Sequence, residues 1–177
     1  MDEPAGGDTL RQDQEQTEAS RRLSGREAAR QDPSAPAIAG YVLTSRLGAG
    51  AYGEVWKAWQ QRTGKWVALK TFPRRHGVDW LLLQREVERL IKLDKHPNVV
   101  SLLDADLTGD LPYFAMELME GGSLSRFVDP ARRATPEQAA RWAEQIGEAL
   151  CYVHSKGILH CDLKPANVLL DDEGRVR

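Results

Sequence analysis

The chain has 177 residues, of which 41% are hydrophobic and 28% charged, a composition that allows one globular domain with an attached tail. The formal net charge of −2 gives no electrostatic reason to expect binding to nucleic acid or to an anionic membrane. No apolar run approaches the roughly 20 residues that a membrane-spanning helix needs. The two cysteines, Cys151 and Cys161, lack the spacing of a zinc site, so we expect reduced thiols in a cytoplasmic protein.

Residues 1–39 are predicted to form a disordered tail. They are rich in Gln, Glu, Asp, Arg and Ala and contain few large apolar side chains. Such a segment cannot bury enough surface to offset the entropy lost on ordering. Its first residues, 1–7, also lack the apolar stretch of a secretory signal. A structured domain is expected to follow the tail, over residues 40–177.

Strand patterns dominate the first half of this domain. Apolar and β-branched residues bounded by turn residues predict five strands, over residues 41–47, 54–60, 66–72, 99–104 and 112–118. Asp79 is a candidate N-cap for one inserted helix, residues 80–93, whose apolar positions recur at helical spacing.

Helical patterns follow Gly121-Gly122, which we interpret as a flexible joint. A short helix is expected over residues 123–128, and a long one over 136–155, with Thr135 as N-cap and Gln138 in the capping-box position. Residues 158–159 and 168–170 are predicted as short strands. Strands with one inserted helix, then a glycine joint and helices, indicate two lobes with a ligand cleft between them.

A glycine-rich loop, Gly48-Ala49-Gly50-Ala51-Tyr52-Gly53-Glu54-Val55, lies between the first two predicted strands. In a dinucleotide-binding fold the same spacing would lie between a strand and a helix. A glycine-rich hairpin can instead fold over phosphates, because the missing side chains let backbone N–H groups approach. The alternative is a hairpin that is simply flexible.

Lys70 lies among apolar neighbours on the third predicted strand. An unpaired ammonium there would be costly, so it needs anions, and phosphates together with a carboxylate would serve. Glu86 is the favoured carboxylate because it shares one side of the inserted helix with Leu83 and Leu90, whereas Glu88 lies on a different face.

The stretch His160-Cys161-Asp162-Leu163-Lys164-Pro165-Ala166-Asn167 resembles the catalytic loop of a Ser/Thr protein kinase. Together with the glycine-rich loop, Val67-Ala68-Leu69-Lys70 and Glu86, it makes residues 41–177 resemble the first part of a eukaryotic-like Ser/Thr protein kinase domain. The resemblance implies an α+β, two-lobed fold, with a five-stranded antiparallel N-lobe sheet over about 40–118, a hinge at 117–122 and a partial helical C-lobe over 123–177.

The resemblance also implies roles for the polar residues of these motifs in ATP-dependent phosphoryl transfer to a protein Ser or Thr hydroxyl. Asp162 would accept or orient the hydroxyl proton, and Lys164 would meet the transferred phosphate. Asn167 would be a ligand of Mg²⁺, while Lys70 and Glu86 would pair at the ATP phosphates. His160 is expected to pack and to form hydrogen bonds.

The ATP site implied by the resemblance combines the glycine-rich loop, the neighbouring strands and the hinge. Met116 would gate the back of the adenine pocket, the hinge backbone would bond adenine, and Ser123 would lie near the ribose. The full set of expected contact residues is Leu47, Gly48, Gly50, Gly53, Val55, Ala68, Lys70, Met116, Glu117, Leu118 and Met119.

Two departures from the family pattern qualify these expectations. Cys161 stands where most members have an Arg that pairs with an activation-loop phosphate, so activity is expected not to require that phosphate. The second magnesium ligand, in an Asp-Phe-Gly motif, is expected beyond Arg177. We therefore expect weak catalysis by the 177-residue chain, and low stability because the apolar face of the long helix needs further helices.

Two other functions fit parts of the pattern. A non-catalytic nucleotide- or partner-binding remnant of a kinase would not need an intact polar set, yet Lys70, Glu86, Asp162 and Asn167 are all present. A small-molecule phosphotransferase could share the two-lobed fold. Two short motifs favour a protein kinase over it, Lys164-Pro165 and His96-Pro97-Asn98.

Overall fold

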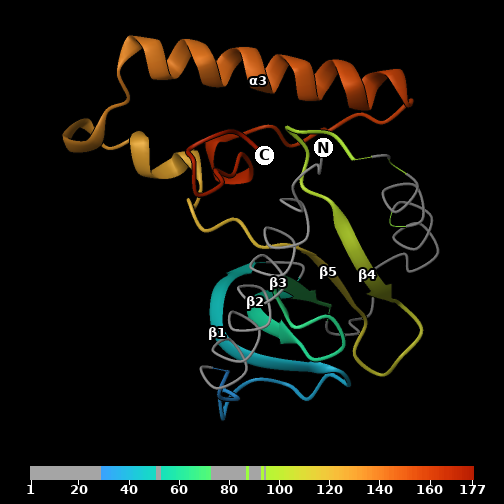
Figure 1. Ribbon diagram of the computed structural model, residues 1–177. Helices are drawn as coiled ribbons and strands as arrows, with labels where there is room; N and C mark the ends of the chain where they lie inside the picture. The colour runs from blue at the N-terminus through green and yellow to red at the C-terminus, as the bar shows by residue number, and fades with distance from the viewer. Residues whose placement is uncertain (1–28, 51–52, 73–86, 88–92, 94) are drawn as a thin grey trace, which may run out of the picture. The chain divides into compact units, whose positions relative to one another are not determined.

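The computed structural model describes residues 29–50, 53–72, 87, 93 and 95–177 (Figure 1). The chain divides into two compact units, Met1–Pro73 and Arg74–Arg177. The prediction of a five-stranded antiparallel sheet is confirmed, with the strand order β1-β2-β3-β5-β4. The helix predicted over residues 80–93 lies outside the described residues, except for Leu93 and for Val87, which is helical and buried.

The first unit contains three strands joined as an antiparallel meander: β1 (Tyr41–Gly50), β2 (Gly53–Gln60) and β3 (Lys65–Thr71). One face of β2 and β3 is apolar and buried, because Trp56 lies opposite Leu69 and Ala58 lies opposite Val67. Side chains alternate between the two faces of a strand, so the residues between these pairs lie on the opposite face.

Residues before β1 are ordered against it, although the sequence places them in the tail. The Asp32 N–H donates to the Leu43 carbonyl oxygen at 2.8 Å, and the Leu43 N–H donates to Gln31 Oε1 at 3.0 Å. Ile38 is 8% exposed. These bonds satisfy backbone groups on the free edge of β1, which a sheet otherwise leaves unpaired. Residues 1–28 of the predicted tail lie outside the described residues.

The second unit begins its described part with a hairpin of β4 (Leu102–Asp106) and β5 (Tyr113–Glu117). Asp106 Oδ1 closes the connecting loop by accepting from the N–H groups of Thr108 and Gly109, at 2.9 and 3.1 Å. β4 starts later than the predicted residue 99, because the Val99 N–H is used in a turn with the His96 carbonyl oxygen.

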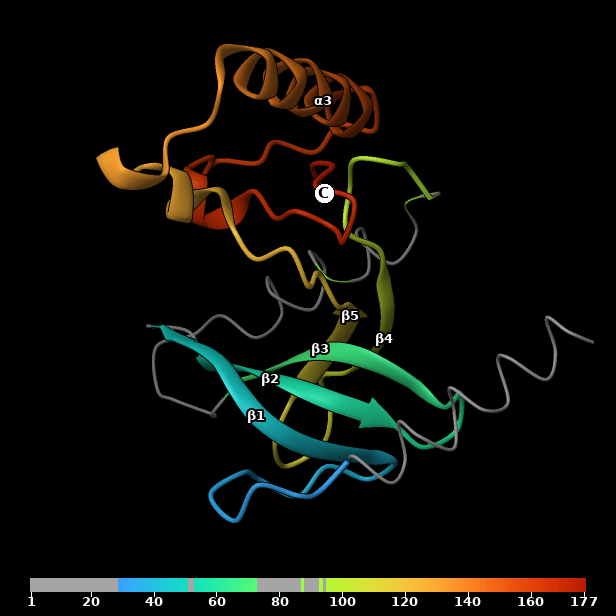
Figure 2. The ribbon, with the colours of Figure 1, turned by 60° about the vertical axis from the view of Figure 1, so that its left-hand side comes forward.

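The long helix α3 (Pro136–Ser155) confirms the predicted bounds. Its capping box is complete: the Gln138 N–H donates to Thr135 Oγ1 at 3.2 Å, and the Thr135 N–H donates to Gln138 Oε1 at 3.0 Å. The other described helices are single turns of 3₁₀ type, η1 (Leu124–Phe127), η2 (Pro130–Arg132) and η3 (Pro165–Asn167). Figure 2 shows α3 running alongside the segment that ends at the C-terminus.

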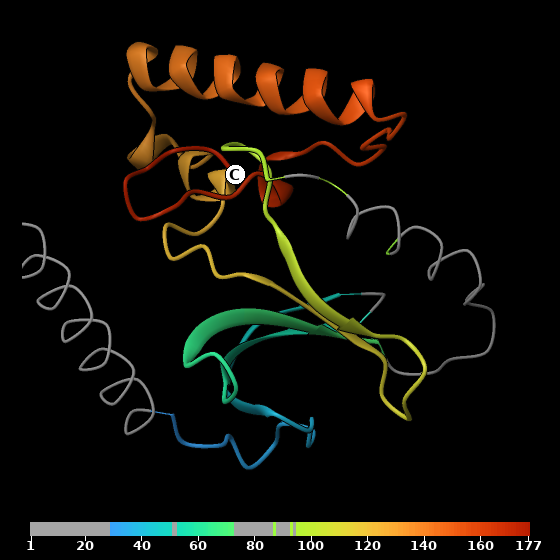
Figure 3. The ribbon, with the colours of Figure 1, turned by 45° about the vertical axis from the view of Figure 1, so that its right-hand side comes forward.

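The core of the second unit joins α3 to that C-terminal segment. Trp142 of α3 packs with Val168, Leu170 and Val176, and its ring contacts Phe127 with 4.7 Å between centroids. Trp142 Nε1 also donates to the Gly174 carbonyl oxygen at 3.0 Å. Figure 3 shows this segment turning back beneath α3.

The short strands predicted around the catalytic loop are largely replaced by loop structure. Residues 158–159 form no strand, so that prediction is wrong. Residues 168–170 form only isolated bridges, Ser123 with Leu169 and Leu170 with Val176. In the described part of the chain no helix has the length and apolar character needed to cross a membrane.

Candidate active site

The glycine-rich loop is the end of the β1–β2 hairpin, as predicted. Pairing continues to the tip, with Ala49 opposite Glu54 and Gly50 opposite Gly53. The tip residues 51–52 lie outside the described residues. Gly53 has φ of +136°, a conformation that L side chains rarely adopt. A Cβ at Gly50 would meet nothing within 4 Å, so its backbone is open to an approaching group.

Three predicted nucleotide contacts lie on one face of the first unit. Val55 is paired with Lys70, and Lys57 with Ala68, which places these side chains on the face opposite the Trp56–Leu69 core. Burial lowers the pKa of Lys70, and its ammonium lies 5.3 Å from the centroid of the Phe72 ring. A partly buried ammonium on this face favours an anionic ligand.

Two other predicted residues bear on the same unit. Leu47 is 51% exposed and lies at a register shift between Arg46 and Gly48, so its side chain is available for contact. Glu86, the predicted partner of Lys70, lies outside the described residues.

In the second unit the structure brings together Asp162, Lys164 and Asn167. Asp162 Oδ2 lies 2.8 Å from Lys164 Nζ and accepts from Asn167 Nδ2 at 2.8 Å. Asn167 Nδ2 also donates to the Asp162 carbonyl oxygen at 2.8 Å. The η3 turn sets this geometry, because the Asn167 N–H donates to the Lys164 carbonyl oxygen at 2.9 Å and so returns the chain to Asp162.

These contacts determine the charge of Asp162. The hydrogen bonds from Lys164 and Asn167, helped by the charges of Lys164 and His160, hold the pKa of Asp162 below its usual value. The carboxylate is therefore ionised at neutral pH. A group of this kind is a good hydrogen-bond acceptor and a weak base, which suits phosphoryl transfer, where positioning contributes more than early proton removal.

Asn167 fits the expected role of a magnesium ligand. Both of its bonds to Asp162 use Nδ2, so the amide oxygen Oδ1 is not engaged in either of them. Amide and carboxylate oxygens are the ligands that Mg²⁺ prefers. The donor set at Asn167 and Asp162 is thus compatible with a magnesium ion.

Cys161 occupies a strained position that the sequence did not predict. Its φ is +56°, which is rare outside glycine. The Asp162 N–H closes the turn by donating to the His160 carbonyl oxygen at 2.8 Å, and it lies 3.3 Å from His160 Nδ1. His160 therefore forms hydrogen bonds within the loop, while the Cys161 thiol is exposed and free.

The predicted hinge, residues 117–122, begins at the last residue of β5. Met116 lines a cavity of about 360 Å³ together with Leu102 and Phe114. The Glu117 N–H donates to the Ser101 carbonyl oxygen at 3.1 Å, so this donor is already used within the second unit. Within the part of the chain that the structure describes, no hydrogen bond engages the Met119 N–H.

Gly121 packs closely against the segment that follows the catalytic loop, whereas the flexibility of Gly121-Gly122 stays a prediction. A Cβ at Gly121 would lie 2.4 Å from the Asp171 carbonyl oxygen and 2.5 Å from that of Leu170. The Leu170 N–H also donates to the Gly122 carbonyl oxygen at 2.8 Å. The end of the predicted hinge is therefore tied to residues 170–171, a contact that the glycine pair could have signalled.

Comparison with known proteins decides the family. The family model for the protein kinase domain matches residues 41–177. The chain belongs to the protein kinase family. The matched range of this kinase chain, residues 41–177, contains every candidate site residue named from the sequence.

Relatives of this kinase chain carry protein kinase names, among them a serine/threonine-protein kinase. It is 39% identical over 141 residues to Serine/threonine-protein kinase ULK3 of Rattus norvegicus, covering 76% of this chain and 29% of the relative. It is 36% identical over 137 residues to Mitogen-activated protein kinase kinase kinase kinase 3 of Homo sapiens, covering 77% of this chain and 15% of the relative. CBL-interacting protein kinase 9 of Oryza sativa subsp. japonica is 34% identical over 140 residues, covering 77% of this chain and 30% of the relative. The kinase chain thus spans less than a third of the length of these curated relatives.

Proposed function

We propose that this kinase transfers the γ-phosphoryl group of ATP, bound with Mg²⁺, to a Ser or Thr hydroxyl of a protein substrate. The observation that carries the proposal is the cluster in which Asp162 Oδ2 meets both Lys164 Nζ and Asn167 Nδ2 at 2.8 Å. The serine/threonine-protein kinase name of one relative supports the substrate class. A Lys two residues after the loop Asp, as at Lys164, supports it as well.

The cluster divides the chemistry among its members. Asp162 orients the substrate hydroxyl by accepting its hydrogen bond, and it takes the proton as the new bond to phosphorus forms. Lys164 is 53% exposed, so its ammonium can move toward negative charge on the transferred group. When bound, Mg²⁺ neutralises phosphate charge, and Asn167 Oδ1 is the atom that would hold it.

Each unit, taken by itself, offers groups that suit a nucleotide. In the first unit Lys70 offers a partly buried ammonium and the glycine-rich loop offers open backbone. In the second unit the Glu117 carbonyl and the Met119 N–H offer one acceptor and one donor for adenine. We assign Glu86 as the carboxylate partner of Lys70.

Phosphoryl transfer from labelled ATP to a mixture of Ser, Thr and Tyr peptides, in the presence of Mg²⁺, tests the proposal. We expect labelling of Ser and Thr peptides, and a loss of about a hundredfold or more in rate for Asp162→Asn, with ATP affinity unchanged. Asp172→Asn is the matched control, because Asp172 is an exposed carboxylate outside the cluster.

Each result of this assay has a distinct meaning. Equal rates for Asp162→Asn and the wild type would refute the assigned role of Asp162. ATP binding without transfer to any peptide would refute the catalytic proposal and favour a nucleotide-binding kinase remnant. Labelling of Tyr peptides alone would refute the Ser/Thr assignment.

We also propose a cytoplasmic location and a protein partner. Both cysteines, Cys151 and Cys161, are free and exposed, as is usual in a reducing compartment. A net charge of −2 offers no attraction for nucleic acid, which leaves a protein substrate as the expected macromolecular partner.

A further inference from the structure

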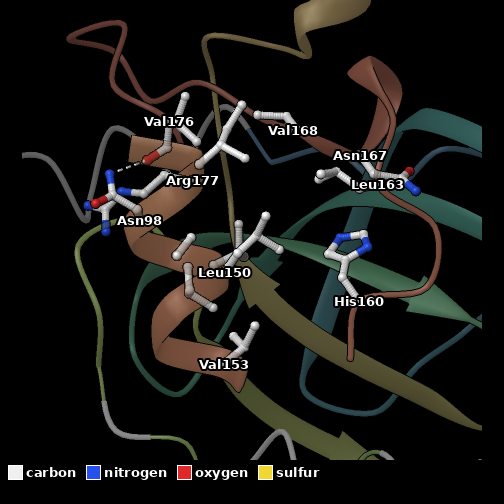
Figure 4. Close-up of a pocket in the computed structure, with 13 residues that line it drawn as sticks. Asn98, Leu150, Val153, His160, Leu163, Asn167, Val168, Val176 and Arg177 are labelled. Atoms are coloured by element: carbon white, nitrogen blue, oxygen red, sulfur yellow. Dashed lines mark hydrogen bonds between the residues drawn. The ribbon is translucent and has the colours of Figure 1, made fainter. Parts of the chain in front are cut away.

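The backbone of Val176 is held on both sides by side-chain amides. The Val176 N–H donates to Gln145 Oε1 of α3 at 2.9 Å. Asn98, from the loop before β4, donates from Nδ2 to the Val176 carbonyl oxygen at 3.0 Å (Figure 4). Val176 is 2% exposed and Asn98 is 6% exposed. Both polar groups of one residue are therefore fixed from two different elements.

Val176 in turn fixes the hairpin formed by residues 168–177. Leu169 and Arg177 exchange two backbone hydrogen bonds, at 3.1 and 2.8 Å, and Leu170 forms a bridge with Val176. Asp171 Oδ1 closes the tip by accepting from the N–H groups of Glu173 and Arg175, at 3.0 and 2.9 Å. The strand paired with Val176 therefore cannot slide without breaking these bonds.

Residues 168–170, the first side of this hairpin, continue directly from the catalytic loop. Leu169 is two residues after Asn167, whose Nδ2 orients Asp162. Asn98, Val176, His160 and Asn167 also line one cavity of about 220 Å³, so the two amide contacts and the catalytic loop share its walls (Figure 4). α3 contributes apolar side chains to that wall as well, among them Leu150 and Val153. Val176 and the catalytic loop are therefore neighbours in the fold.

We propose that Asn98 and Gln145 are positioning residues of the kinase reaction: by clamping Val176 they hold the catalytic loop so that Asn167 and Asp162 keep their mutual geometry. This inference rests on the proposed function. Neither amide lies in the catalytic loop, and Asn98 reaches Val176 across 78 positions of sequence. Both act through the backbone of the hairpin.

The clamp requires opposite chemistry from its two amides. Gln145 must offer an acceptor to an N–H, whereas Asn98 must offer a donor to a carbonyl oxygen. Gln145→Glu keeps an acceptor at the same position and should retain the clamp. Gln145→Met keeps the length of the side chain but has no such acceptor and should lose it. Asn98→Leu removes the donor.

Hydrogen exchange of the full chain, followed by mass spectrometry, tests the clamp without requiring activity. In Gln145→Met and Asn98→Leu we expect exchange in residues 160–168 to quicken about three- to tenfold, the factor for one ordinary hydrogen bond. Exchange in β2 and β3 should not change. Gln145→Glu should match the wild type, as should Glu144→Met, an exposed neighbour on α3. If Asn98→Leu fails to fold, the two Gln145 variants decide alone.

A second readout separates positioning from general stability. The gain in ATP affinity on adding Mg²⁺ should fall in Gln145→Met and return in Gln145→Glu, because only the loop that holds Asn167 is disturbed. Faster exchange confined to residues 174–177, with 160–168 unchanged, would overturn the inference. If the variants exchange faster in residues 160–168 but the wild-type chain transfers no phosphoryl group, the clamp is supported and the proposed function is refuted.

Discussion

Replacing Gly121 by alanine should destabilise the second unit by forcing two backbone segments apart. The added Cβ would lie 2.4 Å from the Asp171 carbonyl oxygen, 2.5 Å from the Leu170 carbonyl oxygen and 2.8 Å from the Leu170 carbonyl carbon. Real Cβ contacts below about 3 Å are essentially absent, and backbone atoms cannot rotate away as a flexible side chain can. The segments must therefore separate.

Two hydrogen bonds join these segments and set the magnitude. The Leu170 N–H donates to the Gly122 carbonyl oxygen at 2.8 Å, and the Leu124 N–H donates to the Val168 carbonyl oxygen at 2.9 Å. At about 1 kcal/mol net for each bond, their loss should lower the free energy of unfolding by about 2 kcal/mol.

Gly147→Ala is the matched control for this change. Gly147 lies inside α3 and a Cβ there would meet nothing within 4 Å, so alanine should raise the free energy of unfolding by about 0.5–1 kcal/mol. Urea unfolding, monitored by tryptophan fluorescence, measures both variants. If Gly121→Ala unfolds at the same urea concentration as Gly147→Ala, the close approach of the hinge to residues 170–171 is wrong.

Two further predictions concern Lys70 and the start of α3. Burial lowers the pKa of Lys70, so between that pKa and the ordinary value of about 10.4 the unfolded chain binds more protons and stability rises with pH. Lys70→Met should remove this alkaline rise and increase stability at pH 7, as measured by urea unfolding across pH; an unchanged pH profile would contradict it. Thr135→Ala should lower the free energy of unfolding by about 1 kcal/mol through loss of the capping box, whereas Thr135→Ser should not. Circular dichroism during thermal unfolding compares the pair, and equal midpoints would count against the cap.

Features that depend on neighbouring residues were predictable from the sequence. The capping box joins Thr135 to Gln138, three positions apart, and the pattern identified it. The catalytic cluster spans only the short loop from Asp162 to Asn167, so its residue types and spacing were sufficient to indicate it. The positions of β2 and β3 were also predictable, because both are runs of apolar and β-branched residues bounded by turn residues.

Other features depend on segments far apart in the chain, for which no spacing rule exists. The Asn98–Val176 bond joins residues 78 positions apart, and Trp142 reaches Gly174 across 32 positions. The start of β4 and the absence of a strand at residues 158–159 likewise depend on where backbone groups find partners. Propensity alone does not determine those partners.

The sequence by itself therefore indicated the family, most of the strands, the long helix and the candidate site residues, because these follow from local patterns of residue type. Only the tertiary structure decided how those residues are held. Gly121 must be glycine because a carbonyl from another segment lies against it, and Val176 is fixed by amides from two elements. Close packing between distant segments sets such requirements, and that packing is defined only once the chain has folded.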